Sequence, residues 1–146
     1  MKGFGEKNQS KREKILKNKQ KVNISQLIKK AFELQSQGKK LEAAKYYVYL
    51  IKQGIKDYRV YSNYGIFLNE IGKYKESESK LKKAISLNPK YANAYYNLAV
   101  LYISRGNLEK AEFELKKAIK LKSDFAIAHY NPVSYTHLTL PTILRV

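Results

Sequence analysis

The chain of 146 residues contains no cysteine, no tryptophan and only three prolines. Without cysteine it can form neither a disulfide nor a thiolate metal site, and we expect a cytoplasmic location. Proline and glycine interrupt helices, so three prolines and seven glycines favour a helical fold. The sequence also lacks an apolar run of about 18 residues, the length that a membrane-spanning helix requires. These absences predict an all-helical protein without a membrane span.

Acidic residues are scarce as well, with 12 Asp and Glu against 29 Lys and Arg, which gives a formal net charge of +17. Residues 1–22 are the most basic segment, and we predict that they form a disordered or partly helical arm. Three roles are open for this arm: a solvated tail, binding to an anionic membrane, or salt-sensitive binding of nucleic acid. The side chains that would contact nucleic acid are Lys11, Arg12, Lys14, Lys17, Lys19 and Lys21.

What the sequence does contain is an internal repeat with a period of 34 residues, marked by Gly38, Gly72 and Gly106. Small residues recur with the same period, which indicates places where helices approach closely. Apolar residues between the glycines follow helical spacing, and each glycine suits a turn with positive φ. The pattern predicts helices over residues 24–37, 40–53, 58–71, 74–87, 92–105 and 108–121. A helix pair cannot cover its own apolar face, so neighbouring pairs should stack into an α-solenoid.

This pattern resembles the tetratricopeptide repeat family. The residues that carry the resemblance are Pro89, Tyr95, Leu98, Ala99, Tyr102, Gly106, Leu108, Ala111, Leu115 and Ala118. The resemblance covers residues 23–131, with units near 24–57, 58–91 and 92–125 and the start of a fourth at 126–131. It implies a right-handed superhelix of antiparallel helix pairs with a concave groove that binds a protein or peptide.

The C-terminal segment departs from the repeat at Pro132, where a fourth unit should continue with leucine. A proline inside a helix costs about 3 kcal/mol, so the helix that starts near residue 126 should not continue past it. The stretch VSYTHLTLPT, residues 133–142, matches an in-frame translation of a sequencing adapter. We therefore expect residues 132–146 to be a non-native artefact of read-through that truncates the protein. The alternative is a natural extended tail.

Catalytic constellations are missing from the sequence. His129 stands at the repeat phase of Tyr61 and Tyr95 and so should be a packing residue, and His137 belongs to the tail. Lysine and glutamate alternate along the helices as on a solvated surface. We predict no enzyme activity within these residues, no cofactor and no metal site.

Asparagine gives the sharpest candidate site. Asn63, Asn97 and Asn131 recur at one phase of the first helix of each unit, which would place them in a row along the concave wall. An asparagine amide both donates and accepts, so such a row can hold an extended peptide backbone. The other interpretation is that each amide bonds the adjacent helix or water. The same wall should be lined by Arg59, Ser62, Ile66, Asn69, Asn93, Tyr96, Val100 and Ile103.

The sequence thus predicts a peptide-binding scaffold or adaptor. One alternative is the substrate-recruiting region of a larger glycosyltransferase, sulfotransferase or methyltransferase. A second is a basic protein that associates with RNA. Because we expect the chain to be truncated, the predicted helix over residues 108–121 lacks a following helix to cover it, so the fragment should fray or self-associate at this C-terminal edge.

Overall fold

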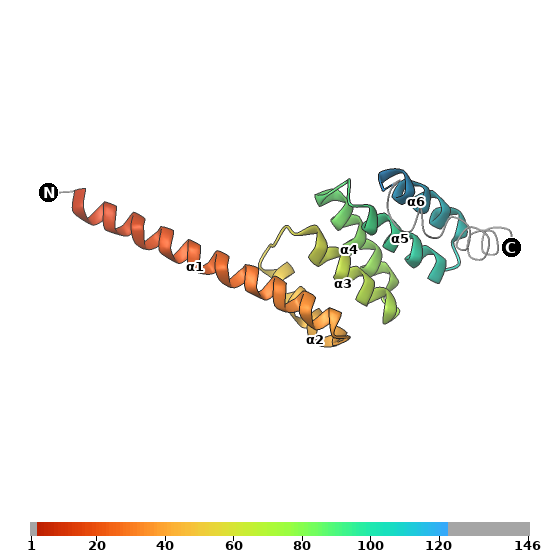
Figure 1. Cartoon of the computed structure of the whole chain (residues 1–146), viewed down its shortest axis with the longest axis horizontal. Coiled ribbons are helices and arrows are strands. Elements are labelled where there is room, and N and C mark those ends of the chain that lie inside the picture. Colours follow the sequence, from red (N-terminus) through yellow and green to blue (C-terminus); the bar gives the residue numbers. More distant parts are fainter. Residues whose placement is uncertain (1–2, 123–146) are drawn as a thin grey trace. The chain divides into compact units, whose positions relative to one another are not determined.

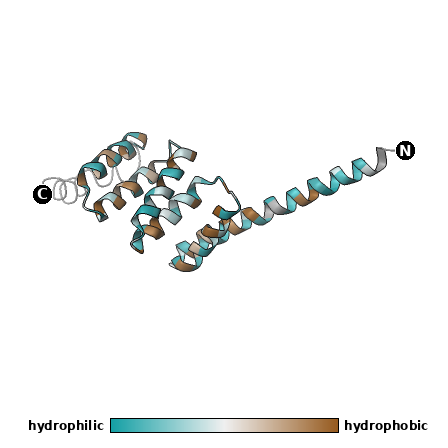
Figure 2. Ribbon diagram, turned by 180° about the vertical axis from the view of Figure 1, so that it is seen from behind, coloured by the Kyte–Doolittle hydropathy of each residue, from teal (hydrophilic) through white to brown (hydrophobic). Residues whose placement is uncertain are grey.

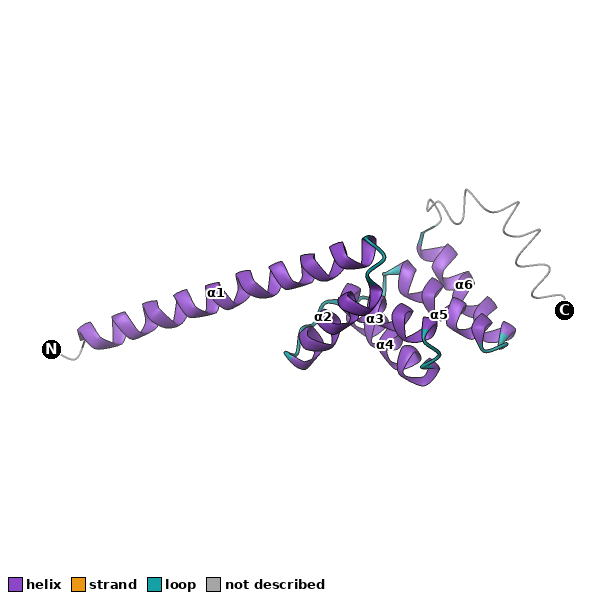
Figure 3. Cartoon of the chain, turned by 90° about the horizontal axis from the view of Figure 1, so that it is seen from below, coloured by secondary structure: helices purple, strands orange, loops and turns teal. Residues whose placement is uncertain are grey.

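The structure, a computed structural model, describes residues 3–122. This part of the chain consists of six α-helices joined by short loops (Figures 1 and 3). It divides into two units, and the boundary along the chain lies between Gly54 and Ile55. The predicted all-α fold of antiparallel helix pairs is confirmed. None of the helices described has the length and apolar content that crossing a lipid bilayer requires.

The first unit contains the long helix α1 (Gly3–Ser36) and the shorter α2 (Lys40–Lys52). Gly38, with φ of 77°, reverses the chain between them. Near this turn α1 contributes Ala31 and Leu34 to the buried side chains of the unit, and α2 contributes Tyr47 among others. The Tyr47 hydroxyl donates to Oε1 of Gln35, which ties the two helices together.

The second unit contains two helix pairs, α3 (Tyr58–Glu70) with α4 (Tyr74–Leu87) and α5 (Ala92–Ser104) with α6 (Leu108–Leu121). Helix α5 packs on both α3 and α4, so the pairs stack. The core of this stack consists of Leu81, Leu98, Ala99, Leu101, Tyr102, Ala111 and Leu115. Stacking of one pair on the next is how a repeat protein buries the apolar face that each pair leaves open.

A carboxylate at the edge of the core links the two pairs of the second unit. Glu78 of α4 accepts a hydrogen bond of 2.9 Å from the Tyr102 hydroxyl and forms an ion pair of 3.1 Å with Arg105. Lys82, one turn further along α4, lies 2.8 Å from the same carboxylate. The pKa of Tyr102 is raised to about 12, mainly by burial of the side chain and secondly by its hydrogen bond to Glu78.

Five of the six helices begin at the predicted residue or within a residue of it, but α1 begins at Gly3 rather than near residue 24. Hydrophobic periodicity located the other helices, and residues 5–21 have almost none because they are rich in Lys, Gln and Asn. Lysine and glutamine nevertheless have good helix propensity, and no proline interrupts the segment. The described part of the basic arm is therefore continuous with the first repeat helix.

Candidate functional site

Helices α3 and α5 lie side by side in the second unit, and the residues expected to line the groove are on these two helices (Figure 1). Most of these side chains are half-buried, as a ligand-accessible wall requires. The half-buried members are Asn63, Ile66, Asn69, Asn93, Tyr96, Asn97, Val100 and Ile103. Asn131, the third member of the asparagine row, lies outside the residues that the structure describes.

One predicted wall residue turns inward instead. Ser62 is completely buried, so it cannot contact a ligand directly, and its assignment to the groove surface needs correction. Its hydroxyl oxygen accepts a hydrogen bond of 3.1 Å from Nδ2 of Asn97, which joins α3 to α5. Because Nδ2 faces Ser62, the amide oxygen of Asn97 faces away from that hydroxyl. Half of the Asn97 amide therefore bonds the neighbouring helix, as the second interpretation of the asparagine row proposed.

A second polar contact joins the same helices two turns further along. Nδ2 of Asn69 lies 3.5 Å from Oγ of Ser104, and that hydroxyl donates to the carbonyl oxygen of Val100 at 3.0 Å. The Asn69 amide oxygen is buried and has no hydrogen-bond partner among the described residues. A contact of 3.5 Å is at the limit of a hydrogen bond, so this pair is weaker than Ser62–Asn97.

The two polar pairs are seven residues apart on each helix, or about 10 Å along the helix axis. Ile66 and Val100 lie between them in sequence on α3 and α5, which places an aliphatic strip between two polar ends. Tyr96 and Ile103 pack against the core cluster from the same helix. About three residues of extended peptide would span the distance between the polar pairs.

Arg59 is held at the start of α3 by Asp57. The guanidinium Nε and Nη2 lie 3.0 and 2.7 Å from the two carboxylate oxygens, and Oδ1 also accepts from the Arg59 backbone N–H at 2.9 Å. Burial acts to raise the pKa of Asp57, but the hydrogen bonds and charge of Arg59 outweigh it, so that this pKa is lowered. The arrangement caps α3 and neutralises the charge of Arg59.

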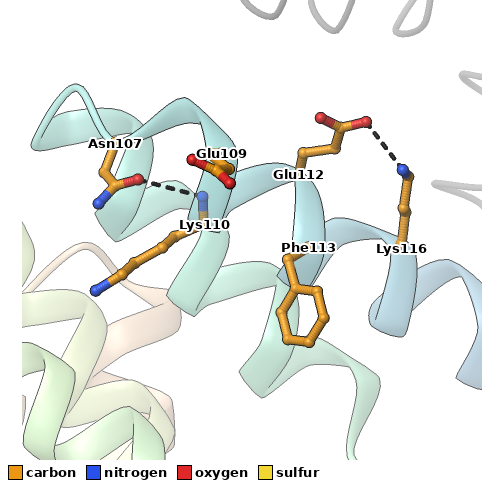
Figure 4. A pocket seen from close by; sticks show the side chains of 6 residues that line it. All are labelled: Asn107, Glu109, Lys110, Glu112, Phe113 and Lys116. Atoms are coloured by element: carbon orange, nitrogen blue, oxygen red, sulfur yellow. Dashed lines mark hydrogen bonds and ion pairs between the residues drawn. The ribbon is translucent and has the colours of Figure 1, made fainter.

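An open pocket of about 490 Å³ lies on α6, where sequence analysis predicted no site. Figure 4 shows Phe113 among side chains of both charges, including the ion pair of 3.0 Å between Glu112 and Lys116. The Phe113 ring is 60% exposed, and Nζ of Lys117 lies 4.1 Å from its centroid. The sequence feature that could have indicated this pocket is Phe113 itself, an aromatic residue at a repeat position that Lys45 and Ser79 occupy in the two preceding units.

The first unit has an open pocket of its own, about 390 Å³ in volume. Leu27, Tyr46 and Tyr49 provide its apolar surface, and Asn23 and Lys45 complete it. Neither pocket combines a nucleophile with a base. Within the range 3–122, histidine, cysteine and carboxylate side chains form no group of three suited to a metal ion.

A family model described as tetratricopeptide repeat matches residues 68–130. A search of curated proteins finds no significant match. Among solved structures, a mutant of the O-GlcNAc transferase of Thermobaculum terrenum is 25% identical with a TM-score of 0.69, over 74% of this chain and 21% of that one. This chain therefore spans about a fifth of the transferase.

Two further structures share the fold. YrrB, a tetratricopeptide repeat protein with an unusual peptide-binding site, is 25% identical with a TM-score of 0.64, over 71% of this chain and 54% of YrrB. MamA is 26% identical with a TM-score of 0.67, over 88% of this chain and 80% of MamA. This chain thus spans about half of YrrB and most of MamA.

Proposed function

We propose that this chain, which belongs to the tetratricopeptide repeat family, is a scaffold that binds an extended peptide of a partner protein along α3 and α5. The proposal rests on one observation: half-buried asparagines and an aliphatic strip share the wall formed by these two helices. The peptide-binding site of YrrB, a protein of the same fold, also supports it. We propose no catalytic role for the described residues.

Binding would use the peptide backbone more than its side chains. Because Nδ2 of Asn97 is held by Ser62, the amide oxygen of Asn97 would accept from a peptide N–H. Asn63, at the same phase on α3, would provide a second amide. Ile66 and Val100 would contact an aliphatic side chain of the ligand between the polar ends. Such a site would favour sequences with one apolar residue and few charges.

Selection from a library of random peptides, each of about 12 residues and displayed on phage, tests this proposal. We expect peptides enriched on the wild-type chain to lose binding to N63A/N97A by at least about tenfold, because each buried hydrogen bond that is left unmade costs about 1–3 kcal/mol. The matched control is N8A/N18A, which makes the same two changes on α1.

A third variant distinguishes a residue that positions Asn97 from the residues that contact the peptide. S62A removes the hydroxyl that holds Asn97 but leaves both wall amides in place, so it should lower the stability more than the affinity. Circular dichroism shows which variants remain folded. If the enriched peptides bind N63A/N97A as tightly as they bind the wild type, the wall on α3 and α5 is not the binding site.

A second candidate is the recruiting region of a larger enzyme, supported by the likeness to the Thermobaculum terrenum O-GlcNAc transferase. In that case the same wall would bind the substrate protein of a catalytic domain encoded by the same gene. Sequencing genomic DNA across codon 131 tests this candidate and the adapter interpretation of residues 132–146. A reading frame with further repeats and a transferase domain would support it, and a stop codon soon after the repeats would contradict it. The cytoplasmic location stays a prediction.

A further inference from the structure

The helical conformation of α1 arranges the lysines of the basic arm on one face. Lys7, Lys11, Lys14, Lys17 and Lys21 are separated by four, three, three and four residues. Residues with this spacing lie along one side of an α-helix, within an arc of about 120°. We call this row the lysine stripe. It is about 21 Å long, because 14 residues separate its ends.

The surroundings of the lysine stripe leave its charge uncompensated. All five lysines are exposed, and in the part of the chain that the structure describes none of them has an ion-pair partner. Glu6 and Glu13 lie outside the stripe, about 80° and 100° from its centre on the side of Lys17, whereas Arg12 and Lys19 lie nearer the opposite side of the helix. Figure 2 shows that this half of α1 is mostly hydrophilic.

This charge pattern fits a phosphate backbone better than a lipid surface. Ile15 and Leu16 are 55% and 61% exposed, but as adjacent residues they are about 100° apart and form no continuous apolar face. An interfacial helix needs such a face to insert between lipids. Residues 5–21 also contain no aromatic side chain on which the bases of a single strand could stack. The observations therefore favour a duplex.

We propose that the lysine stripe binds the phosphate backbone of double-stranded DNA, without reading its sequence. The major groove of B-form DNA is about 12 Å wide and admits an α-helix, whereas that of A-form RNA is too narrow. With the lysine stripe facing the phosphates, Glu6 and Glu13 would lie at the side of the interface rather than within it. This activity is independent of peptide binding on α3 and α5.

The test uses two exchanges of neighbouring charges that leave the composition of the full chain unchanged. E13K/K14E places a glutamate within the lysine stripe, and R12E/E13R exchanges two charges that both lie outside it. Fluorescence anisotropy with a DNA duplex of about 24 base pairs measures binding between 50 and 200 mM salt. We expect E13K/K14E to bind at least about eightfold more weakly at 0.1 M salt, since each lost phosphate contact costs that factor. R12E/E13R should stay within about twofold of the wild type.

Three outcomes would overturn the proposal. An unchanged affinity in both variants would mean that net charge alone determines binding, and equal losses would mean that the face of α1 on which a charge lies does not matter. Stronger binding to an RNA duplex of the same sequence, or to vesicles containing phosphatidylserine, would mean that DNA is not the partner. Absence of measurable binding at 50 mM salt would mean that the stripe is only a solvated face. Circular dichroism of both variants checks that their helix content equals that of the wild type.

Discussion

The close approach of α3 and α4 at Gly65 allows a quantitative prediction for Gly65→Ala. A methyl group at Gly65 would lie 2.7 Å from Cγ and 2.9 Å from Cδ2 of Leu81, and 3.4 Å from the carbonyl oxygen of Ser77. Leu81 is fully buried, so it cannot move into solvent. The Ser77 hydroxyl also donates to the Gly65 carbonyl oxygen at 2.6 Å, which holds the two helices at this separation.

Two effects of opposite sign determine the result. Alanine is favoured over glycine within a helix by about 1 kcal/mol. Overpacking a core of this kind costs about 1–3 kcal/mol, and a helix shift would also weaken the Ser77–Gly65 hydrogen bond, worth about 1 kcal/mol. We therefore expect Gly65→Ala to lower the free energy of unfolding by about 1–2 kcal/mol.

The next repeat provides the decisive comparison, because it has Ala99 and Ala111 where this one has Gly65 and Ser77. Both alanines are buried there in one cluster with Leu115, the equivalent of Leu81. Without the serine hydroxyl the two helices are not held together by this bond, so a methyl group fits between them. The double variant G65A/S77A should consequently be more stable than the sum of the two single effects predicts, by about 1 kcal/mol.

Urea unfolding followed by circular dichroism at 222 nm measures all three variants against the wild type. Gly5→Ala is the matched control, since a methyl group at Gly5 has no neighbour within 4 Å. It should be neutral or slightly stabilising. If Gly65→Ala unfolds at the wild-type midpoint, or if the effects of the double variant are strictly additive, the close approach of α3 and α4 does not depend on the Gly65–Ser77 pair.

Three further predictions concern the edge of the core and its end. Hydrogen bonding by Lys82 lowers the pKa of Glu78 from 4.5 despite some burial, so this carboxylate stabilises the fold above pH 4.5 and loses that effect in more acidic solution. E78Q should lower the free energy of unfolding by about 1 kcal/mol at pH 7, and the stability of this variant should depend less on pH in acid. The pKa of Tyr102 is raised to about 12, so stability should fall as the pH rises from 10 to 12, and Y102F should not show this loss in alkaline unfolding. Ile119 and Leu121 are each 40% exposed on α6, so I119K/L121K should reduce any self-association measured by sedimentation; an unchanged distribution would contradict this route.

The parts of the fold that could be predicted are those with a repeated physical cause. Gly38, Gly72 and Gly106 all have positive φ, so their 34-residue spacing located the turns. Repeat phase also placed Asn63 and Asn97 among the half-buried residues of α3 and α5. It could not show that Ser62 is buried, because adjacent residues of a helix are about 100° apart and a small rotation decides which one faces the neighbouring helix.

The distribution of charge separates the two proposed binding activities. Helices α3 and α5 together contain one basic residue, Arg59, and one acidic residue, Glu70, and Arg59 is paired with Asp57. A peptide held there by amides and aliphatic contacts would consequently bind with little dependence on salt. The lysine stripe has five uncompensated charges, so its affinity for DNA should fall steeply between 50 and 200 mM salt. Ionic strength alone should therefore release DNA and leave the peptide bound, and release of both together would mean that a single charged surface serves both ligands.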